Sequence, residues 1–502
     1  MKFRILLAAS WVALLAGCAH QQIAPASAAA IIPAPQSLVR SDGQLRLGDT
    51  LAVQVDGAAP RAHRALDAAL DGLGIAVSDE AATRLQLRLV NEDALGDEGY
   101  RLRIADDIAL EARTDAGLFH AVQSLRQLMP ASPALAGQAV VLPRLAITDA
   151  PAYGWRGISL DVARSFLPLD YLRQHIDRMA FFKFNRLHLH LTDDQGWRVE
   201  IKAYPRLTEI GGASAVKGGR AGFYTQAELK DLVAYAAERG ITIVPEIDLP
   251  SHVQAAIASY NELACDDVTN LGPYDGLKVG FNILCLEKPE VVYPFVRGVL
   301  GEIAAIFPSE YIHVGGDEIK HPLYADFVGR ATRIVNELGR KAVVWEEGSV
   351  ADSRPDTLLQ LWNDSYEIAP ALARGHQLIL SPCSYFYIDH GNVAGQPQTY
   401  DWCRKEGVPM DRVYSFDPGG FKQVAGVEAA LWSELAHTDA AVDNRLWPRL
   451  AAVAEVAWSP ASQRDYADFL GRLRALRGQF DAMRIDYYAG TEVWGESDAT
   501  YD

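Results

Sequence analysis

Eight short apolar runs recur from about Tyr153 to about residue 485, and they constrain the fold more than any other feature of the chain. Each run has the length and composition of a buried β-strand and ends in polar or aromatic residues, and helical patterns lie between several of them. One helical pattern carries both end signals, because Thr225 and Glu228 form a capping box at its start and Gly240 closes it. Eight strands alternating with helices predict an α/β fold of the (β/α)8 TIM barrel type, which we place at residues 149–485. The runs are GISLDVA, RLHLHLT, ITIVPEIDL, YIHVGGD, AVVWEE, TLLQLW, QLILSP and VEAALWSE.

A shorter region of different character precedes the predicted barrel. Residues 51–55 and 85–89 alternate apolar and polar side chains like strands, and a helical pattern between them ends at Gly74. The string EGYRLRIADDIALEAR predicts a hairpin that turns at Asp106-Asp107, and an amphipathic helix follows it. We expect a small α+β domain at residues 36–148 and a polar tail at 486–502.

The N-terminal segment has the pattern of a bacterial lipoprotein signal. Lys2 and Arg4 precede an apolar run that is too short to span a bilayer as a lasting helix. This run ends in Leu-Ala-Gly-Cys, which resembles a lipobox with Cys18 as the lipidated first residue of the mature protein. An ordinary cleaved signal with an incidental cysteine is the alternative, and both interpretations predict export to the cell envelope, either as an outer-membrane-anchored lipoprotein or in the periplasm. We expect residues 1–18 to be this signal segment, residues 19–35 to be a flexible tether, and the lipid anchor to be the sole contact with a membrane.

The acidic composition limits the possible partners. The formal net charge of −17 speaks against nucleic acid, because phosphate binding requires basic surfaces. We therefore expect no nucleic-acid partner, and the sequence leaves the oligomeric state open.

Four further cysteines fall in two pairs that each bracket a loop. Export permits disulfides, and Cys265 and Cys285 enclose a segment rich in Gly, Asn and Asp that a bridge would fix. Cys383 and Cys403 also enclose a loop, but Cys383 follows a predicted buried strand and could be a free thiol. We predict the first bridge and leave the second open.

Polar and aromatic side chains follow the predicted strands at the end where a (β/α)8 barrel carries its chemistry. The fourth run ends in two glycines and two adjacent acids, Asp317 and Glu318. Neighbouring residues of a regular strand face opposite sides, but the glycines allow a turn that brings both carboxylates to one cleft. Carboxylates beside aromatic platforms suit a pyranose, and paired acids suit glycosidic cleavage. The side chains expected at this end are Arg164, Asp193, Asp194, Glu246, Asp248, His252, Asp317, Glu318, Trp345, Glu346, Glu347, Trp362, Tyr387, Asp389, Trp432 and Glu434.

Several of these strand ends lie in strings that resemble the motifs of glycoside hydrolase family 20, the exo-acting β-N-acetylhexosaminidases: LDVARSF, KFNRLHLHLTDDQGWR, PEIDLPSH, HVGGDE and GVEAALWSE. EGYRLRI followed by GLFHAVQSLRQL is similar to the small domain before that family's barrel, so the resemblance runs from about residue 36 to about 485. It implies retaining, substrate-assisted hydrolysis, in which the 2-acetamido oxygen of the substrate attacks the anomeric carbon and forms an oxazolinium ion. It also implies no cofactor, no metal, and a carbohydrate substrate with a terminal β-linked N-acetylglucosamine or N-acetylgalactosamine. Two positions depart from the family's pattern, because Ser251 stands where glycine is usual and Glu346-Glu347 stand where more neutral residues are common.

The resemblance also implies a role for each matching residue. Glu318 would protonate the leaving oxygen and then activate water, Asp317 would orient the acetamido N–H, and Tyr387 would bond the acetamido oxygen. Three tryptophans would form aromatic walls, three polar residues would bind the sugar hydroxyls, and three more would set the proton affinity of Glu318. These sets are Trp345, Trp362 and Trp432; Arg164, Asp389 and Glu434; and Asp193, Asp248 and His252.

Two other functions fit parts of the pattern. His188 and His190 share a strand face and resemble the metal pair of the amidohydrolases, a metal-dependent class on the same barrel. That class needs histidines at the fifth and sixth strand ends, where this sequence has Trp345 and Trp362. The second alternative, a non-catalytic glycan-binding lipoprotein, predicts loss of the acid, whereas Glu318 is present. A place in the core beside Asp193 accounts for the two histidines equally well, so we leave them off the list of site residues.

Overall fold

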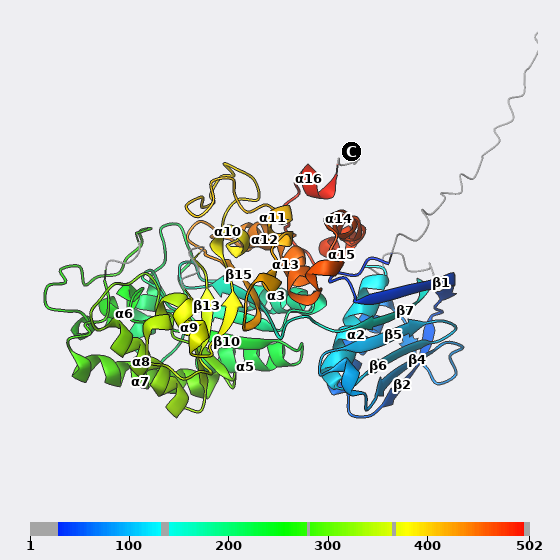
Figure 1. Cartoon of the computed structure of the whole chain (residues 1–502), viewed down its shortest axis with the longest axis horizontal. Coiled ribbons are helices and arrows are strands. Elements are labelled where there is room, and N and C mark those ends of the chain that lie inside the picture. Colours follow the sequence, from blue (N-terminus) through cyan, green and yellow to red (C-terminus); the bar gives the residue numbers. More distant parts are fainter. Residues whose placement is uncertain (1–28, 132–139, 279–281, 364–367, 496–502) are drawn as a thin grey trace, which may run out of the picture.

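The computed structural model describes residues 29–131, 140–278, 282–363 and 368–495, which form a small sheet domain beside a larger barrel (Figure 1). The predicted signal segment with Cys18, the tether up to residue 28 and residues 496–502 of the tail lie outside these ranges. Within the described ranges, no helix is both long enough and apolar enough to cross a membrane.

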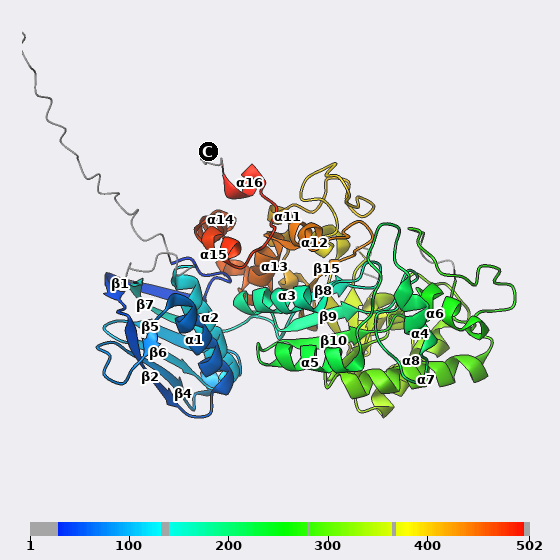
Figure 2. The ribbon, with the colours of Figure 1, turned by 180° about the vertical axis from the view of Figure 1, so that it is seen from behind.

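The small domain is a seven-stranded sheet with two helices on one face. Leu85 and Leu87 are fully buried whereas Gln86 and Arg88 between and beside them are more exposed, which is the alternation expected of a half-covered strand. Both helices lie on the face that looks toward the barrel (Figure 2). The strand order is β1-β7-β5-β6-β4-β2-β3. The elements are β1 Ser37–Arg46, β2 Thr50–Asp56, α1 Pro60–Leu73, β3 Ala76–Val77, β4 Arg84–Leu89, β5 Tyr100–Ile104, β6 Ile108–Ala112, α2 Asp115–Leu128 and β7 Val141–Asp149.

The eight predicted apolar runs are the eight parallel strands of a closed barrel, so the predicted fold class is confirmed. Every residue of β8 is buried, as expected for a strand that packs against side chains inside the barrel and helices outside it. The strands are β8 Trp155–Asp161, β9 Arg186–His190, β10 Thr242–Glu246, β11 Tyr311–His313, β12 Lys341–Trp345, β13 Leu358–Leu361, β14 Gln377–Leu380 and β15 Val424–Leu431.

Helices of very different length connect and cover these strands. The predicted capping box is present, because Thr225 accepts the Glu228 N–H and Glu228 accepts the Thr225 N–H. A short 3-10 helix, η5 (Glu346–Val350), takes the place of an α-helix after β12, so the residues that follow Trp345 stay near the barrel mouth. The α-helices are α3 Leu169–Phe181, α4 Arg206–Glu209, α5 Gln226–Ala237, α6 Gln254–Ser259, α7 Pro289–Ile306, α8 Tyr324–Glu337, α9 Ala369–Ala373, α10 Cys383–Phe386, α11 Met410–Tyr414, α12 Asp439–Leu446, α13 Arg449–Trp458, α14 Tyr466–Ala475, α15 Arg477–Ala482 and α16 Thr491–Trp494.

Residues 29–35, predicted to be part of a flexible tether, are packed between the two domains. Ile31 and Ile32 are fully buried, which withdraws their side chains from water. The Ile32 N–H donates to Gln127 Oε1 at 2.7 Å, and Arg472 Nη1 donates to the Ile31 carbonyl at 2.7 Å. The prediction of a flexible tether is therefore wrong from residue 29 onward. The predicted boundary after residue 148 falls one residue before the end of β7.

The described part of the predicted polar tail is also packed. Trp494 on α16 is buried, and its ring lies 5.6 Å from that of Phe480. Arg474 Nε donates to the Val493 carbonyl at 2.7 Å. In the sequence, the polar residues around Trp494 outweighed this single aromatic anchor.

Candidate active site

A cavity of about 260 Å³ opens at the carboxyl end of the barrel strands, where the sequence predicted the site. Most of the predicted site residues lie on its wall, and they come from many different strand ends. The lining residues are Arg164, His190, Asp193, Asp248, His252, Leu277, Asp317, Glu318, Trp362, Tyr387, Asp389, Tyr400, Trp402, Trp432 and Glu434.

The loop after β11 brings the two adjacent acids to one side, as the sequence predicted. Gly315 and Gly316 have φ angles of +68° and +100°, which glycine adopts without strain. A Cβ on Gly315 would lie 1.7 Å from Asp248 Oδ1, so a side chain at this position is also excluded by space. After this turn, Asp317 and Glu318 both face the ring of His252.

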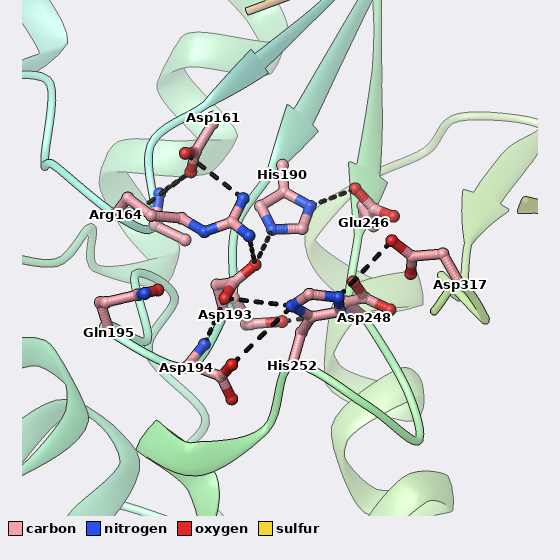
Figure 3. Close-up of polar contacts among 12 residues, drawn as sticks. Asp161, Arg164, His190, Asp193, Asp194, Gln195, Glu246, Asp248, His252 and Asp317 are labelled. Atoms are coloured by element: carbon pink, nitrogen blue, oxygen red, sulfur yellow. Dashed lines mark hydrogen bonds and ion pairs between the residues drawn. The ribbon is translucent and has the colours of Figure 1, made fainter. Parts of the chain in front are cut away.

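His252 links the acids to a chain of buried charges (Figure 3). Its Nε2 lies 3.6 Å from Asp317 Oδ2 and 3.4 Å from Glu318 Oε2, and its Nδ1 lies 3.4 Å from Asp193 Oδ1. Asp193 Oδ2 in turn lies 2.7 Å from Arg164 Nη2. Burial opposes the charged form of His252, but the surrounding carboxylates, Asp193 first, raise its pKa well above the ordinary value. The ring is therefore a cation that both adjacent acids share.

The two acids have opposite pKa shifts. Burial raises the pKa of Asp317, and the His252 cation works against this rise. The hydrogen bond from His252 holds the pKa of Glu318 below its ordinary value, and the Glu318 side chain keeps 36% of its surface exposed. In the open cavity, Glu318 thus favours the ionised state.

Several polar groups on the opposite wall are buried but lack a hydrogen-bond partner among the described residues. They are Arg164 Nε and Nη1, both oxygens of Asp389, and Glu434 Oε2. Burial raises the pKa of Glu434 to about 7. Buried donors and acceptors normally find partners, so these groups are suited to a ligand that carries many hydroxyls.

Aromatic rings complete the wall beside these polar groups. Trp362 and Tyr387 stack with 6.2 Å between ring centroids, and Trp432 lies 5.9 Å from Tyr387. The Arg164 guanidinium lies 5.1 Å from the Trp432 ring centroid, which is cation–π distance. The wall therefore offers flat apolar faces next to hydrogen-bonding groups.

Trp345 departs from its predicted place. Its side chain is fully buried and is not part of the cavity wall. Its indole N–H donates to Glu246 Oε1 at 3.0 Å, which turns the ring inward, and its ring lies 6.1 Å from Trp432. Trp345 supports Trp432 from below in this structure and does not form a wall of its own.

Four cavity residues were missed by the sequence analysis. Leu277 lies on the loop closed by the predicted Cys265–Cys285 disulfide, which the structure contains. Tyr400 and Trp402 lie on the loop closed by Cys383–Cys403, which also forms a disulfide. The paired cysteines could have indicated these residues, because a disulfide near a strand end fixes its loop at the mouth of the barrel. The fourth missed residue is His190, which the sequence analysis left off the list of site residues.

His188 and His190 both belong to a hydrogen-bonded network below the cavity. His188 lies 3.0 Å from Glu246 and 2.9 Å from Glu428, and His190 Nε2 lies 2.8 Å from Asp193 Oδ2. His188, Glu246 and His313 are close enough together to hold a metal ion. Both ring nitrogens of His188 already contact carboxylates. The fifth strand ends in Trp345 and the sixth is followed directly by Trp362, where the metal-dependent alternative requires histidines.

Comparison with known proteins gives matches over nearly the whole described chain. Residues 153–326 and 320–461 match the description "Glycosyl hydrolase family 20, catalytic domain", and residues 28–150 match "Glycosyl hydrolase family 20, domain 2". A β-N-acetylhexosaminidase of Cellulomonas fimi is 36% identical over 487 residues, which cover 92% of this chain and 97% of the relative.

Solved structures agree with these matches. The GH20 β-N-acetylhexosaminidase of Streptomyces coelicolor is similar with a TM-score of 0.86 and 38% identity, covering 93% of this chain and 98% of that one. A mutant β-hexosaminidase of Streptomyces plicatus in complex with the product GlcNAc is similar with a TM-score of 0.85 and 38% identity, covering 93% of this chain and 97% of that one.

Proposed function

The chain belongs to glycoside hydrolase family 20, and on this premise we propose how its residues carry out the reaction. The protein is a glycoside hydrolase of the β-N-acetylhexosaminidase type, an exo-acting retaining enzyme that releases terminal β-linked N-acetylhexosamine. The observation that carries the proposal is that Asp317 and Glu318, although adjacent in sequence, face the same His252 ring at the cavity wall.

The substrate supplies the nucleophile. The acetamido oxygen forms a bond to the anomeric carbon while the bond from that carbon to the leaving oxygen breaks. Glu318 gives its proton to the leaving oxygen. Asp317 accepts the acetamido N–H and stabilises the positive charge that develops there, and Tyr387 donates to the acetamido oxygen to aim it. Glu318 then takes a proton from water, which attacks the anomeric carbon and opens the oxazolinium ring with net retention.

Sugar binding supplies the protonated state that Glu318 needs. In the open cavity the carboxylate is partly exposed and favours ionisation because of His252. A bound pyranose shields the Glu318 carboxyl group from solvent. This burial raises the pKa of Glu318 and favours proton uptake. Asp317 keeps its charge because its contacts with His252 and with the developing oxazolinium both favour the ionised form.

The opposite wall recognises the sugar. The Arg164 guanidinium lies at the cavity wall, where Nε and Nη1 have no hydrogen-bond partner among the described residues and Nη1 lies 3.5 Å from Asp161 Oδ2, and we assign it to the neighbouring O3 and O4 hydroxyls. Asp389 and Glu434 have free oxygens for O4 and O6, and Trp432 offers a flat face to the ring. Together these groups favour a terminal sugar over an internal one, because they surround the end of the sugar ring that is farthest from the scissile bond.

Export and lipid anchoring complete the proposal. The charged start, the short apolar run and the Leu-Ala-Gly-Cys18 string support a lipoprotein signal. Two disulfides suit an oxidising compartment outside the cytoplasm. An anchor at Cys18 would leave ten residues before the packed segment that starts at residue 29.

The test is hydrolysis of an aryl N-acetyl-β-glucosaminide by Glu318→Gln. Loss of a general acid typically lowers the rate about 10²–10⁴-fold, and we expect a fall in kcat of this size. A glycan-binding protein without catalysis would show no wild-type turnover at all. The wild-type enzyme should also leave the plain β-glucoside almost untouched, since that substrate has no acetamido nucleophile, and comparable rates on the two glycosides would refute substrate assistance.

A further inference from the structure

The peptide group that joins Asp317 to Glu318 is held from both sides by side chains outside the cavity wall. We propose that Ser251 and Glu347 are positioning residues that fix this peptide group and thereby aim both carboxylates at the substrate. The inference rests on the proposed function of Asp317 and Glu318, and neither positioning residue lines the cavity.

Ser251 holds the carbonyl side. It is fully buried, and its Oγ donates to the Asp317 carbonyl oxygen at 2.7 Å, which is the usual length for an O–H···O hydrogen bond. Glycine, which has no side chain, would offer no donor at this position. This chain therefore has a restraint on Asp317 that a glycine would lack.

Glu347 holds the N–H side. Its Oε1 accepts the Glu318 N–H at 3.5 Å, a long hydrogen bond, and its two oxygens lie 3.2 and 3.1 Å from the Trp362 indole nitrogen. The short helix η5 is what leaves Glu347 beside the mouth, directly after β12. One carboxyl group thus fixes both the backbone of the acid and an aromatic wall of the cavity.

The peptide group needs such restraint because its local backbone is unusual. Glu318 itself has a φ of +56°, the left-handed region that non-glycine residues seldom adopt, and two glycines with positive φ precede the pair. Beyond β11, which ends at His313, backbone pairing with the neighbouring chain segments continues only to Gly315 among the described residues and does not reach the Asp317–Glu318 peptide group. Rotation of the peptide group would relieve Glu318 and turn both carboxylates away from His252.

The chemistry of Glu347 indicates which variant preserves the contact. Burial, together with the nearby Asp317 charge, raises the pKa of Glu347 to about 7, so a neutral side chain is already accessible at this position near neutral pH. Glutamine keeps a carbonyl oxygen that accepts the Glu318 N–H, whereas alanine has no side-chain acceptor. Glu347→Gln is therefore the conservative variant.

The experiment compares kcat/KM for two substrates in each variant. N,N'-diacetylchitobiose has a poor leaving group that needs a well-placed acid, whereas the 2,4-dinitrophenyl N-acetyl-β-glucosaminide has a good one that needs little protonation. We expect Ser251→Ala and Glu347→Ala to lower kcat/KM about tenfold for the disaccharide and less than about threefold for the aryl glycoside. Glu347→Gln should stay near the wild type on both. The ratio of the two values does not depend on how much of a variant is folded.

Matched controls remove similar contacts far from the cavity. Ser309→Ala removes a hydroxyl that accepts the Tyr311 N–H at the opposite end of β11, and Glu302→Ala removes a carboxyl that accepts the N–H groups of Lys202 and Ala203. Both should keep the wild-type ratio. An unchanged ratio in Ser251→Ala and Glu347→Ala, or the same change in the controls, overturns the inference. A wild-type enzyme inactive on both substrates would instead overturn the proposed function.

Discussion

Arg164 offers the sharpest test of how the cavity recognises a sugar. Its guanidinium is buried, with Nη2 2.7 Å from Asp193 Oδ2, while Nε and Nη1 have no hydrogen-bond partner in the part of the chain that the structure describes. If the guanidinium bonds the O3 and O4 hydroxyls through two of its N–H groups, each charge-assisted hydrogen bond contributes about 1.5–3 kcal/mol. Their joint loss then costs roughly 3–6 kcal/mol, which corresponds to a fall in kcat/KM of roughly a hundredfold to ten-thousandfold.

Arg164→Lys is the variant that isolates this loss. Lysine keeps a positive charge beside Asp193, so the buried acids are not left without a cation, but it lacks the planar fork. The assay is kcat/KM on an aryl N-acetyl-β-glucosaminide and on its 3-deoxy and 4-deoxy analogues. The wild-type enzyme should lose activity on both analogues, and the variant should lose little more on them because the contact is already absent. The assignment would be refuted if kcat/KM of the variant stayed within about threefold of the wild type. It would also be refuted if the variant lost as much kcat/KM on the deoxy analogues as the wild type does.

Two further predictions concern stability and the N-terminus. Burial, with Arg178 nearby, lowers the pKa of His175 to about 3, so between pH 6.5 and 3 the unfolded chain binds a proton that the folded protein does not, and stability falls as the pH falls. Urea denaturation should therefore show that the wild type loses about 2 kcal/mol more than His175→Phe between pH 8 and pH 5, and equal losses would contradict this account. Cys18→Ala should abolish incorporation of labelled palmitate and release the protein from the membrane fraction, whereas an unlabelled wild type would favour the ordinary cleaved signal.

The barrel was predictable because its strands are buried on both faces. A run such as ITIVPEIDL is mostly apolar, with its acids confined to the end at the barrel mouth, and this leaves a strong local pattern. The site was predictable for a related reason, since parallel strands bring their carboxyl ends to one mouth and the residues after each run must meet there.

The remaining features depend on contacts between distant segments, which leave no local pattern. Ile31 and Ile32 lie in a stretch rich in alanine and proline that reads as a linker, and they are buried where Gln127 of α2 and Arg472 of α14 bond their backbone. Trp345 occupies a strand end like its neighbours, but its orientation depends on Glu246 from another strand. Trp402 reaches the cavity from a loop whose position is fixed by the Cys383–Cys403 bridge.

The pKa values of the adjacent acids Asp317 and Glu318 shift in directions opposite to their assigned roles. A pair of carboxylates sharing one site would normally divide acid and base roles between them, with the buried member protonated. Here the more buried member, Asp317, is the one assigned to stay charged, and the more exposed Glu318 is the one assigned to carry the proton. The resting cavity therefore shifts both pKa values away from these roles, and a sugar that buries Glu318 and presents a cationic N–H to Asp317 shifts both of them back. A ligand without the acetamido group can satisfy only the first condition, so it leaves Asp317 without the cation that favours its charge and leaves the anomeric carbon without a nucleophile.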